Sequence, residues 1–346
     1  MDPWIASRRE CMKRRKRPEG DSVDIFDEAA YLLANPDVAQ AVANGSMPSG
    51  AHHFAIAGKF EGRPLSPSQS RNAIVRAELD LNGRGIELGP LDKPIMAKRD
   101  GYQVEIVDYL DTDSLRAQYG HELHVGVDVS LIEEVDHVSR GETLTELIGK
   151  EGAYEWVVAS HVIEHIPDVV SFLQDVERVL SPSGRLGMVV PDKRFCFDFY
   201  GELSTSGQIV DAFVEKRTKP TLGQVVDYFS RTSHVNGAIA WGQARGVVPD
   251  LMYSGDLVRD GYQRSVDGDD FGGEIHCWRF TPESFRLIIA DLRALGLTSL
   301  GIVAEHETIG IEFFVTLGRS DELEPSIEQR RSMLEEVQHS DLPRRS

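Results

Sequence analysis

Residues 154–192 have the sequence YEWVVASHVIEHIPDVVSFLQDVERVLSPSGRLGMVVPD, and this stretch decides the fold class. It starts with an apolar run, 154–160, which predicts a buried β-strand. Apolar residues then recur at helical spacing from Val169 to Leu180, which predicts an amphipathic helix. The segment 184–192 has the pattern of a second buried strand. A strand, a crossover helix and a strand of this length predict two parallel neighbours in one sheet.

Strand and helix patterns alternate along the rest of the segment 71–320. Further strands are expected at 84–89, 102–110, 121–129 and 310–318. A late helix is expected after Thr281, because Thr281 suits the N-cap, a proline follows it and a glycine closes the apolar repeat. We therefore predict an α/β protein with a doubly wound, mostly parallel sheet covered by helices on both faces. Residues 321–346 are expected to form a polar tail, helical or frayed.

The loop after the strand 154–160 contains His161-x-x-Glu164-His165, which is the spacing of an inverted zinc-protease motif. A zinc site of that kind needs both histidines one turn apart on a stable helix. Here a strand leads directly into the motif, and Pro167 suits the first position of the next helix. We therefore interpret the motif as a loop at a strand end, and we expect no metal site in the protein.

Charge and cysteine usage narrow the class of protein. The net charge of −19 divides into +5 for residues 1–17 and −24 for the rest, and an acidic body argues against nucleic acid as the main partner. The basic leader, 1–21, is expected to be disordered; contact with an anionic lipid surface or a nucleic acid is the alternative. Three scattered cysteines, no secretory signal and no apolar run of about 18 residues predict a cytoplasmic chain.

Residues 22–68 carry a separate helical pattern. Asp24 to Leu33 has helical spacing, Asn35-Pro36 starts a second helix, and a third runs from Ser49-Gly50 to Gly58. The pattern D-x-x-x-Y-L-x-x-N-P-D-V, followed by H-F-x-x-x-G-x-x-E-G-R, is similar to a short module of bacterial surface-polysaccharide and secreted proteins. It has no acidic or histidine cluster suited to catalysis. We interpret 22–66 as a docking module for a protein partner; a helical cap on the main domain is the alternative.

Two strand ends carry residues suited to a nucleoside. Gly89, two residues after Glu87, ends the first strand and lets a ligand approach the backbone. Asp108 ends the second strand, where an acid accepts hydrogen bonds from both ribose hydroxyls. The G-x-G-x-x-G of a dinucleotide site is missing, and Pro90 and Pro94 make a poor phosphate cradle. The pattern favours a nucleoside without a pyrophosphate, such as S-adenosylmethionine.

Taken in order, the segments ELGPLDKP, VEIVDY, YEWVVASHVIEHIPD and GRLGMVVPDKRFCFD resemble the class I S-adenosylmethionine-dependent methyltransferases. The resemblance covers 71–320 and is narrower to a bacterial subgroup with S-H-V-I-E-H and P-D-K-R signatures, often associated with polysaccharide synthesis. It implies a Rossmann-like methyltransferase fold and S-adenosylmethionine as cofactor. The cofactor-binding residues that it implies are Glu87, Gly89, Asp108, Glu142, Ser160 and His161, with His165 on the same segment. Leu91 departs from the family's pattern, because a second glycine is usual there.

Methyl transfer from a sulfonium needs an aligned acceptor and, for a hydroxyl, a base. The candidates are Asp192, His276 and His165. Asp192 opens the charged run 192–194 at the same sheet edge, for which a surface ion cluster is the alternative, and His276 precedes Trp278, whose indole could stack on a sugar. With the resemblance, this predicts O-methylation of a sugar or glycan-linked hydroxyl. Two alternatives stay open: a non-catalytic scaffold with a methyltransferase-like fold, and a nucleotide-dependent oxidoreductase or epimerase.

Overall fold

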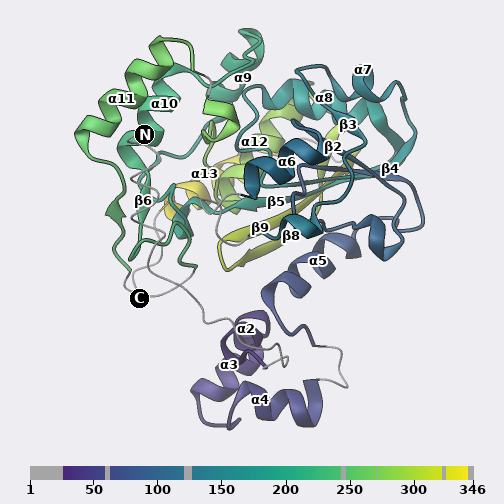
Figure 1. Cartoon of the computed structure of the whole chain (residues 1–346), viewed down its shortest axis with the longest axis vertical. Coiled ribbons are helices and arrows are strands. Elements are labelled where there is room, and N and C mark those ends of the chain that lie inside the picture. Colours follow the sequence, from purple (N-terminus) through teal and green to yellow (C-terminus); the bar gives the residue numbers. More distant parts are fainter. Residues whose placement is uncertain are drawn as a thin grey trace.

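The computed structural model describes residues 26–58, 63–120, 127–242, 247–269, 271–321 and 325–341. Its centre is a seven-stranded sheet. In spatial order the strands are β3 (His137–Val138), β2 (Val104–Asp108), β1 (Gly85–Leu88), β4 (Tyr154–Ser160), β5 (Leu180–Pro191), β9 (Glu312–Arg319) and β8 (Leu300–Ile309). The first five run parallel, and β9 is antiparallel to both β5 and β8. The predicted mostly parallel α/β sheet is confirmed, and Figure 1 shows it with its flanking helices.

Burial on both faces explains why the central strands are apolar throughout. In β4, Val157 packs on one face in the same cluster as Leu173 of α8 (Val169–Val179). Trp156 and Val158 pack on the other face with Val75 of α5 (Pro67–Ala77). All three β4 side chains are fully buried, and each such side chain contributes about 1.5–3 kcal/mol by leaving water.

The cap of α12 (Pro282–Ala294) lies where the sequence predicts it, whereas α8 begins at Val169 and not at Pro167, the residue expected at its first position. Asp168 caps α8 by accepting a hydrogen bond from the amide of Ser171 at 2.9 Å. Thr281 begins α12 in a capping box with Ser284, and Gly296 follows the helix with φ of 68°. The cap fixes where the chain enters each helix, so the loop before α8 and the segment before α12 have defined positions.

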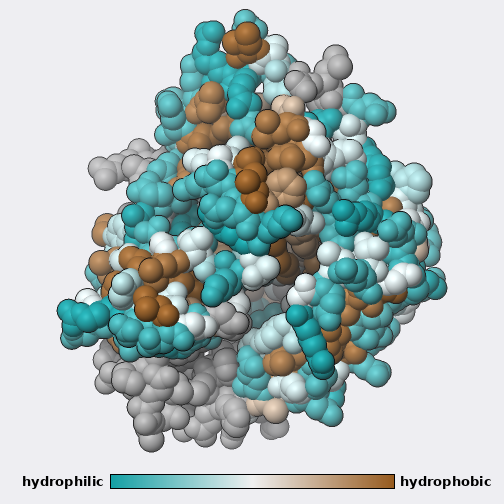
Figure 2. All heavy atoms as spheres, turned by 90° about the horizontal axis from the view of Figure 1, so that it is seen from above, coloured by the Kyte–Doolittle hydropathy of each residue, from teal (hydrophilic) through white to brown (hydrophobic). Residues whose placement is uncertain are grey.

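The segment between β5 and α12 was not assigned from sequence, and it forms helices beside one end of the sheet (Figure 1). Its own core joins Val225, Phe229, Phe271 and Ile275. The remaining elements of the main domain are α6 (Thr112–Tyr119), α7 (Leu144–Ile148), α9 (Ser206–Val214), α10 (Leu222–Arg231), β6 (Ser233–His234), β7 (Asp250–Leu251), α11 (Gly255–Val266) and α13 (Ile327–Ser340). Figure 2 looks down from above in the view of Figure 1, and its apolar patches are separated by hydrophilic residues.

The three helices predicted before the main domain are present: α2 (Glu28–Ala34), α3 (Pro36–Ala43) and α4 (Gly50–His53), the last continued by a π-helix, Phe54–Gly58. Tyr31 is fully buried among them, 5.5 Å from the ring of Phe54, and its hydroxyl lies 2.8 Å from Nδ1 of His53. The carboxylate of Glu28 accepts the amides of Gly50 and Ala51 at the start of α4. Figure 1 shows this bundle set apart from the sheet and connected to it through α5.

The strand expected at 121–129 and the tail expected at 321–346 have different outcomes in the structure. Of the strand expected at 121–129, residues 121–126 lie outside the described part, and Val129–Leu131 is a 3-10 helix instead. The place beside β2 is taken by β3, where Val138 pairs with Asp108. The polar tail forms α13, which packs on α12 through a contact between the hydroxyls of Ser340 and Thr281 at 2.9 Å. The basic leader, 1–21, lies outside the described residues.

Among the described helices, none combines the length and the apolar composition that a membrane-spanning helix requires.

Candidate active site

The strand register brings three of the predicted residues to one edge. Leu88 of β1 pairs with Val107 of β2 and with Ala159 of β4. The next residue along each strand is Gly89, Asp108 or Ser160, so these three lie in a row where the parallel strands end. In open parallel sheets this carboxyl edge is where ligands bind.

Glu87 organises the loop that follows β1. Its side chain is 1% exposed, and its two oxygens accept hydrogen bonds from the amides of Ile95 at 2.6 Å and Met96 at 2.9 Å. Burial raises the pKa of Glu87 to about 7, against the opposing effect of these amides. The residue thus folds the loop back onto the sheet, from inside the protein.

The backbone of this loop turns through left-handed conformations. Gly89 has a φ of 57°, and a Cβ built there would meet no described atom within 4 Å. Leu91, which replaces the family's usual glycine, also has a positive φ, 49°. The loop therefore keeps a shape that glycine favours, although a leucine occupies the position.

We expect Leu91→Gly to be at least as stable as the parent chain. A left-handed φ costs an L-residue about 1–2 kcal/mol, whereas glycine loses about 0.5–1 kcal/mol through the freedom of its unfolded chain. Leu91→Ile should be destabilised relative to the parent, because a β-branched side chain tolerates positive φ poorly. Denaturant unfolding of the three proteins measures both effects. A Gly variant less stable than the Ile variant would contradict this account of the loop.

Asp108 is 7% exposed at the end of β2. Its Oδ1 accepts the amide of Tyr109 at 2.7 Å, and its main-chain oxygen accepts the amide of Ser139 at 2.8 Å. Burial raises its pKa to about 6, so the carboxylate is ionised at neutral pH. An ionised acceptor beside the open backbone of Gly89 fits the ribose and the adjoining chain of a nucleoside cofactor.

Glu142 lies in the loop that follows β3, the neighbour of β2. Its side chain is exposed and accepts a hydrogen bond from the amide of Arg140 at 2.6 Å. Asp136, directly before β3, accepts the amide of Ile106 at 2.7 Å. The structure thus places Glu142 near the β2 end of the row, with Asp136 in a structural role.

Ser160 and His161 belong to a hydrogen-bond network with Arg71 and Glu312, two residues that were not predicted from the sequence for the site. Arg71 of α5 donates to the hydroxyl of Ser160 and, at 2.8 Å, to the carboxylate of Glu312. Nε2 of His161 lies 2.5 Å from the other oxygen of Glu312. Burial opposes protonation of His161, but the hydrogen bond to Glu312 and the nearby Glu164 raise its pKa overall. His161 itself has a positive φ, 54°.

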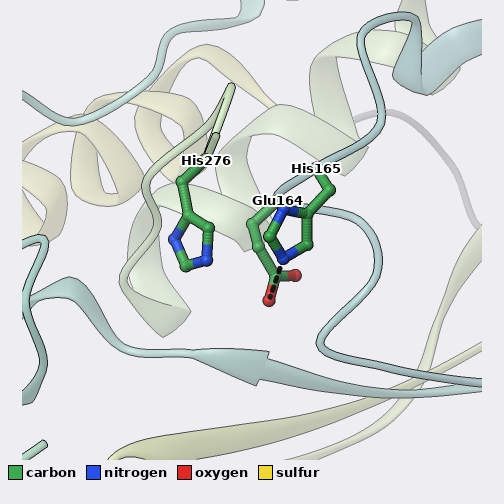
Figure 3. Close-up of side chains that lie close together, drawn as sticks. All are labelled: Glu164, His165 and His276. Atoms are coloured by element: carbon green, nitrogen blue, oxygen red, sulfur yellow. Dashed lines mark ion pairs between the residues drawn. The ribbon is translucent and has the colours of Figure 1, made fainter. Parts of the chain in front are cut away.

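His165 and His276 meet across the next part of the edge. The motif 161–165 is a loop as predicted, and in Figure 3 both imidazoles lie beside the carboxylate of Glu164. The two rings are 4.5 Å apart and nearly perpendicular. Nδ1 of His276 donates to Oδ2 of Asp198 at 2.6 Å, and burial lowers the pKa of His165 to about 3. The result is a buried group of two imidazoles and a carboxylate.

A family match adds to this geometry. Residues 112–188, from α6 into β5, match the family described as a methyltransferase domain. The chain contains a methyltransferase domain. Its fold agrees, and the residues at the ends of β1 and β2 fit the cofactor of such domains, S-adenosylmethionine. The matched segment includes β4 and the loop with His161 and His165, but ends before Asp192 and His276.

Other comparisons do not add to the assignment. No curated protein matches the chain. A solved complex of the trans-methyltransferase CalH with SAH is 17% identical, with a TM-score of 0.32. The match covers 72% of this chain and 54% of that one, so this chain spans about half the length of that protein. The 1,6-didemethyltoxoflavin-N1-methyltransferase of Burkholderia thailandensis is 12% identical (TM-score 0.35, 88% and 94% covered). A SAM-dependent methyltransferase of Methanosarcina mazei is 13% identical (TM-score 0.37, 72% and 98% covered). Similarity this low does not indicate a substrate.

Two residues expected on the acceptor side, Asp192 and Trp278, are buried and bonded in ways that exclude the expected roles. Asp192 is fully buried; its oxygens accept from Arg194, at 2.8 and 2.5 Å, and from Thr308 at 2.6 Å. Lys193 is 3% exposed and pairs with Asp341 at 2.7 Å. The run 192–194 is thus an ion-pair cluster that anchors the C-terminal helix, and Asp192 has no oxygen left to act as a base.

Trp278 cannot stack on a sugar, because it is 2% exposed and its indole donates to the main-chain oxygen of Ile166 at 2.6 Å. Asp198, the last residue of the segment KRFCFD, was not predicted from the sequence as a site residue. Its only sequence signal was its place a few residues beyond a strand end. The β4–α8 loop packs against the segment before α12, where the amide of Trp278 donates to the main-chain oxygen of Glu164 at 3.1 Å. This packing brings Glu164 and His165 to His276. Asp198, which follows β5, joins the group through its bond to His276.

Proposed function

We propose that the protein transfers a methyl group from S-adenosylmethionine to a hydroxyl of a sugar or glycan-linked acceptor, in polysaccharide biosynthesis. The observation that carries the proposal is the Asp198–His276 pair beside His165, next to the end of β4. The cofactor residues Gly89, Asp108 and Ser160 end β1, β2 and β4, so the imidazoles lie on the side where an acceptor would approach.

His276 is suited to take the proton of a hydroxyl. A carboxylate can only accept, so Nδ1 carries the hydrogen that points to Asp198, and in the neutral ring Nε2 has the lone pair. An imidazole fixed in one tautomer by a buried carboxylate is the arrangement of a general base. Burial opposes ionisation of Asp198, but His276 and Arg279 keep its pKa low. Asp198 is therefore a positioning residue for His276.

The reaction balances with these groups alone. The cofactor supplies a methyl group already activated on a sulfonium. The acceptor oxygen bonds to the methyl carbon as the carbon–sulfur bond breaks, the hydroxyl proton passes to Nε2 of His276, and S-adenosylhomocysteine leaves. The domain's part is to align the two substrates and hold the base, which contributes roughly 10²–10⁴-fold to the rate.

The backbone of the β1 loop also argues for an enzyme and against a scaffold. Leu91 was the departure that suggested a degenerate site, yet its φ keeps the left-handed turn. Gly89 next to it leaves its backbone open. Residues 22–66 remain proposed as the docking module for a protein partner.

Labelled S-adenosylmethionine tests the acceptor. The protein is incubated with nucleotide-sugars and cell glycans and, separately, with protein and RNA fractions. We expect label in the sugar or glycan fraction only. Label confined to protein or RNA would refute the glycan acceptor. Calorimetry with S-adenosylhomocysteine checks the cofactor independently, and we expect micromolar binding; no binding would instead favour the scaffold.

A further inference from the structure

Three donor atoms from two distant parts of the chain converge in the methyltransferase domain. Glu164 and His165 lie in the β4–α8 loop, and His276 lies just before α12 (Figure 3). One ligand atom from each lies within 4.8 Å of the others. Glu164 is fully buried, His276 nearly so, and His165 has 29% of its side chain exposed, so the group is reached from the His165 side.

Both imidazoles are oriented by their other nitrogen. Nδ1 of His165 donates to the main-chain oxygen of Ile275 at 3.3 Å, and Nδ1 of His276 donates to Asp198 at 2.6 Å. Since a carbonyl and a carboxylate only accept, Nδ1 carries a hydrogen in each ring, and the neutral form of the ring has its lone pair on Nε2. A histidine that ligates a metal is commonly held in this way, by a carboxylate or a backbone carbonyl.

The carboxylate of Glu164 has no hydrogen-bond donor among the described residues. Both of its oxygens are buried and accept no hydrogen bond, and Nε2 of His165 lies 4.0 Å from Oε1. Nδ1 of His161 approaches Oε1 to 3.4 Å, and Nε2 of that ring is engaged by Glu312. A buried carboxylate without a hydrogen-bond donor is costly, and the cost is relieved by uptake of a proton, by a paired cation or by a metal ion.

We propose that Glu164, His165 and His276 bind a divalent transition-metal ion, such as Zn²⁺ or Co²⁺, through one carboxylate oxygen and the Nε2 atom of each ring. Two imidazoles and a carboxylate are a common ligand set for an open zinc site. Bonds of about 2.0–2.1 Å need donors closer together than they are here, and the part-exposed His165 is the ligand with room to move. An acceptor oxygen would reach a bound ion from the side of His165, the part-exposed member of the group.

This set differs from the one that the sequence motif suggested. The H-x-x-E-H spacing pairs His161 with His165 on a helix, but His161 is committed to Glu312. Only the fold adds His276, which lies more than a hundred residues away in the sequence. The inference goes beyond the proposed function. A bound ion would lower the pKa of the acceptor hydroxyl. Nε2 of His276 would then be a ligand and not the base, and the hydroxyl proton would pass to water.

Cobalt binding tests the site directly. The full chain is stripped with a chelator and titrated with Co²⁺, followed by visible absorption and by metal analysis. We expect one ion per chain. Glu164→Gln, His165→Ala and His276→Ala should each weaken binding at least a hundredfold, and Asp198→Asn about tenfold or more. His306→Ala, which removes an exposed histidine of β8, should bind as the parent does.

Absence of stoichiometric binding in the parent chain, or variants that all titrate like the parent, would overturn the metal site. Circular dichroism and S-adenosylhomocysteine calorimetry on each variant establish that it is folded. Methyl transfer by the stripped protein, without any cobalt binding, would leave the proposed function standing and remove the metal. One bound ion with no labelled glycan would support the metal and remove the proposed acceptor.

Discussion

Asp108→Ala should lower the affinity for S-adenosylhomocysteine at least tenfold in a protein that still folds. The ionised carboxylate ends β2 beside the open backbone of Gly89, where it can accept both ribose hydroxyls. Hydrogen bonds to a charged acceptor contribute about 1.5–3 kcal/mol, and a tenfold change in affinity corresponds to about 1.4 kcal/mol. Calorimetry measures the dissociation constant. An unchanged value in a folded variant would remove Asp108 from the cofactor site.

The pH dependence of binding gives a second measure of the same residue. Burial raises the pKa of Asp108 to about 6 in the free protein, and the bound ribose favours the ionised form. Affinity should therefore rise as the pH increases from 5 to 7 and level off above it. Asp108→Asn, which keeps the size of the side chain but cannot ionise, should bind weakly and without this step. The same step in the Asn variant would assign it to another group.

His276→Ala should reduce methyl transfer by about 10²–10⁴-fold while leaving S-adenosylhomocysteine binding within threefold of the parent. The loss follows whether Nε2 of His276 takes the hydroxyl proton or ligates a metal, because either role acts on the acceptor. His276→Gln serves as a second variant that fills more of the space beside Phe197, whose ring lies 4.6 Å from the imidazole. Labelled transfer to the accepted glycan is the measurement.

His306→Ala is the matched control, since this exposed histidine lies on β8, which β5 and β9 separate from β4. It should retain full transfer. Transfer by both His276 variants within threefold of the parent would exclude His276 from the acceptor site. A loss of cofactor binding together with transfer would instead indicate a role for His276 in folding.

The sequence by itself determined the elements that depend on local physics. Apolar runs and helical spacing located β1, β2, β4, β5 and α8, and Thr281 with the residues after it located α12. Asp108 could be found because an acid at a strand end falls at the binding edge of any parallel sheet. Leu91 could be recognised as a departure, but its φ could not, since a backbone angle of this kind depends on how Glu87 anchors the loop.

Only the tertiary structure decided which polar groups meet. Asp192 and His276 were both predicted as bases, because a sequence shows residue types and not partners. In the folded protein Asp192 pairs with Arg194, and His276 pairs with Asp198. Likewise, the spacing of His161 and His165 does not show that His161 pairs with Glu312 of β9 or that His165 meets a histidine before α12. Such contacts span long stretches of chain, and they form only when the sheet and its helices bury their apolar faces, so no local pattern encodes them.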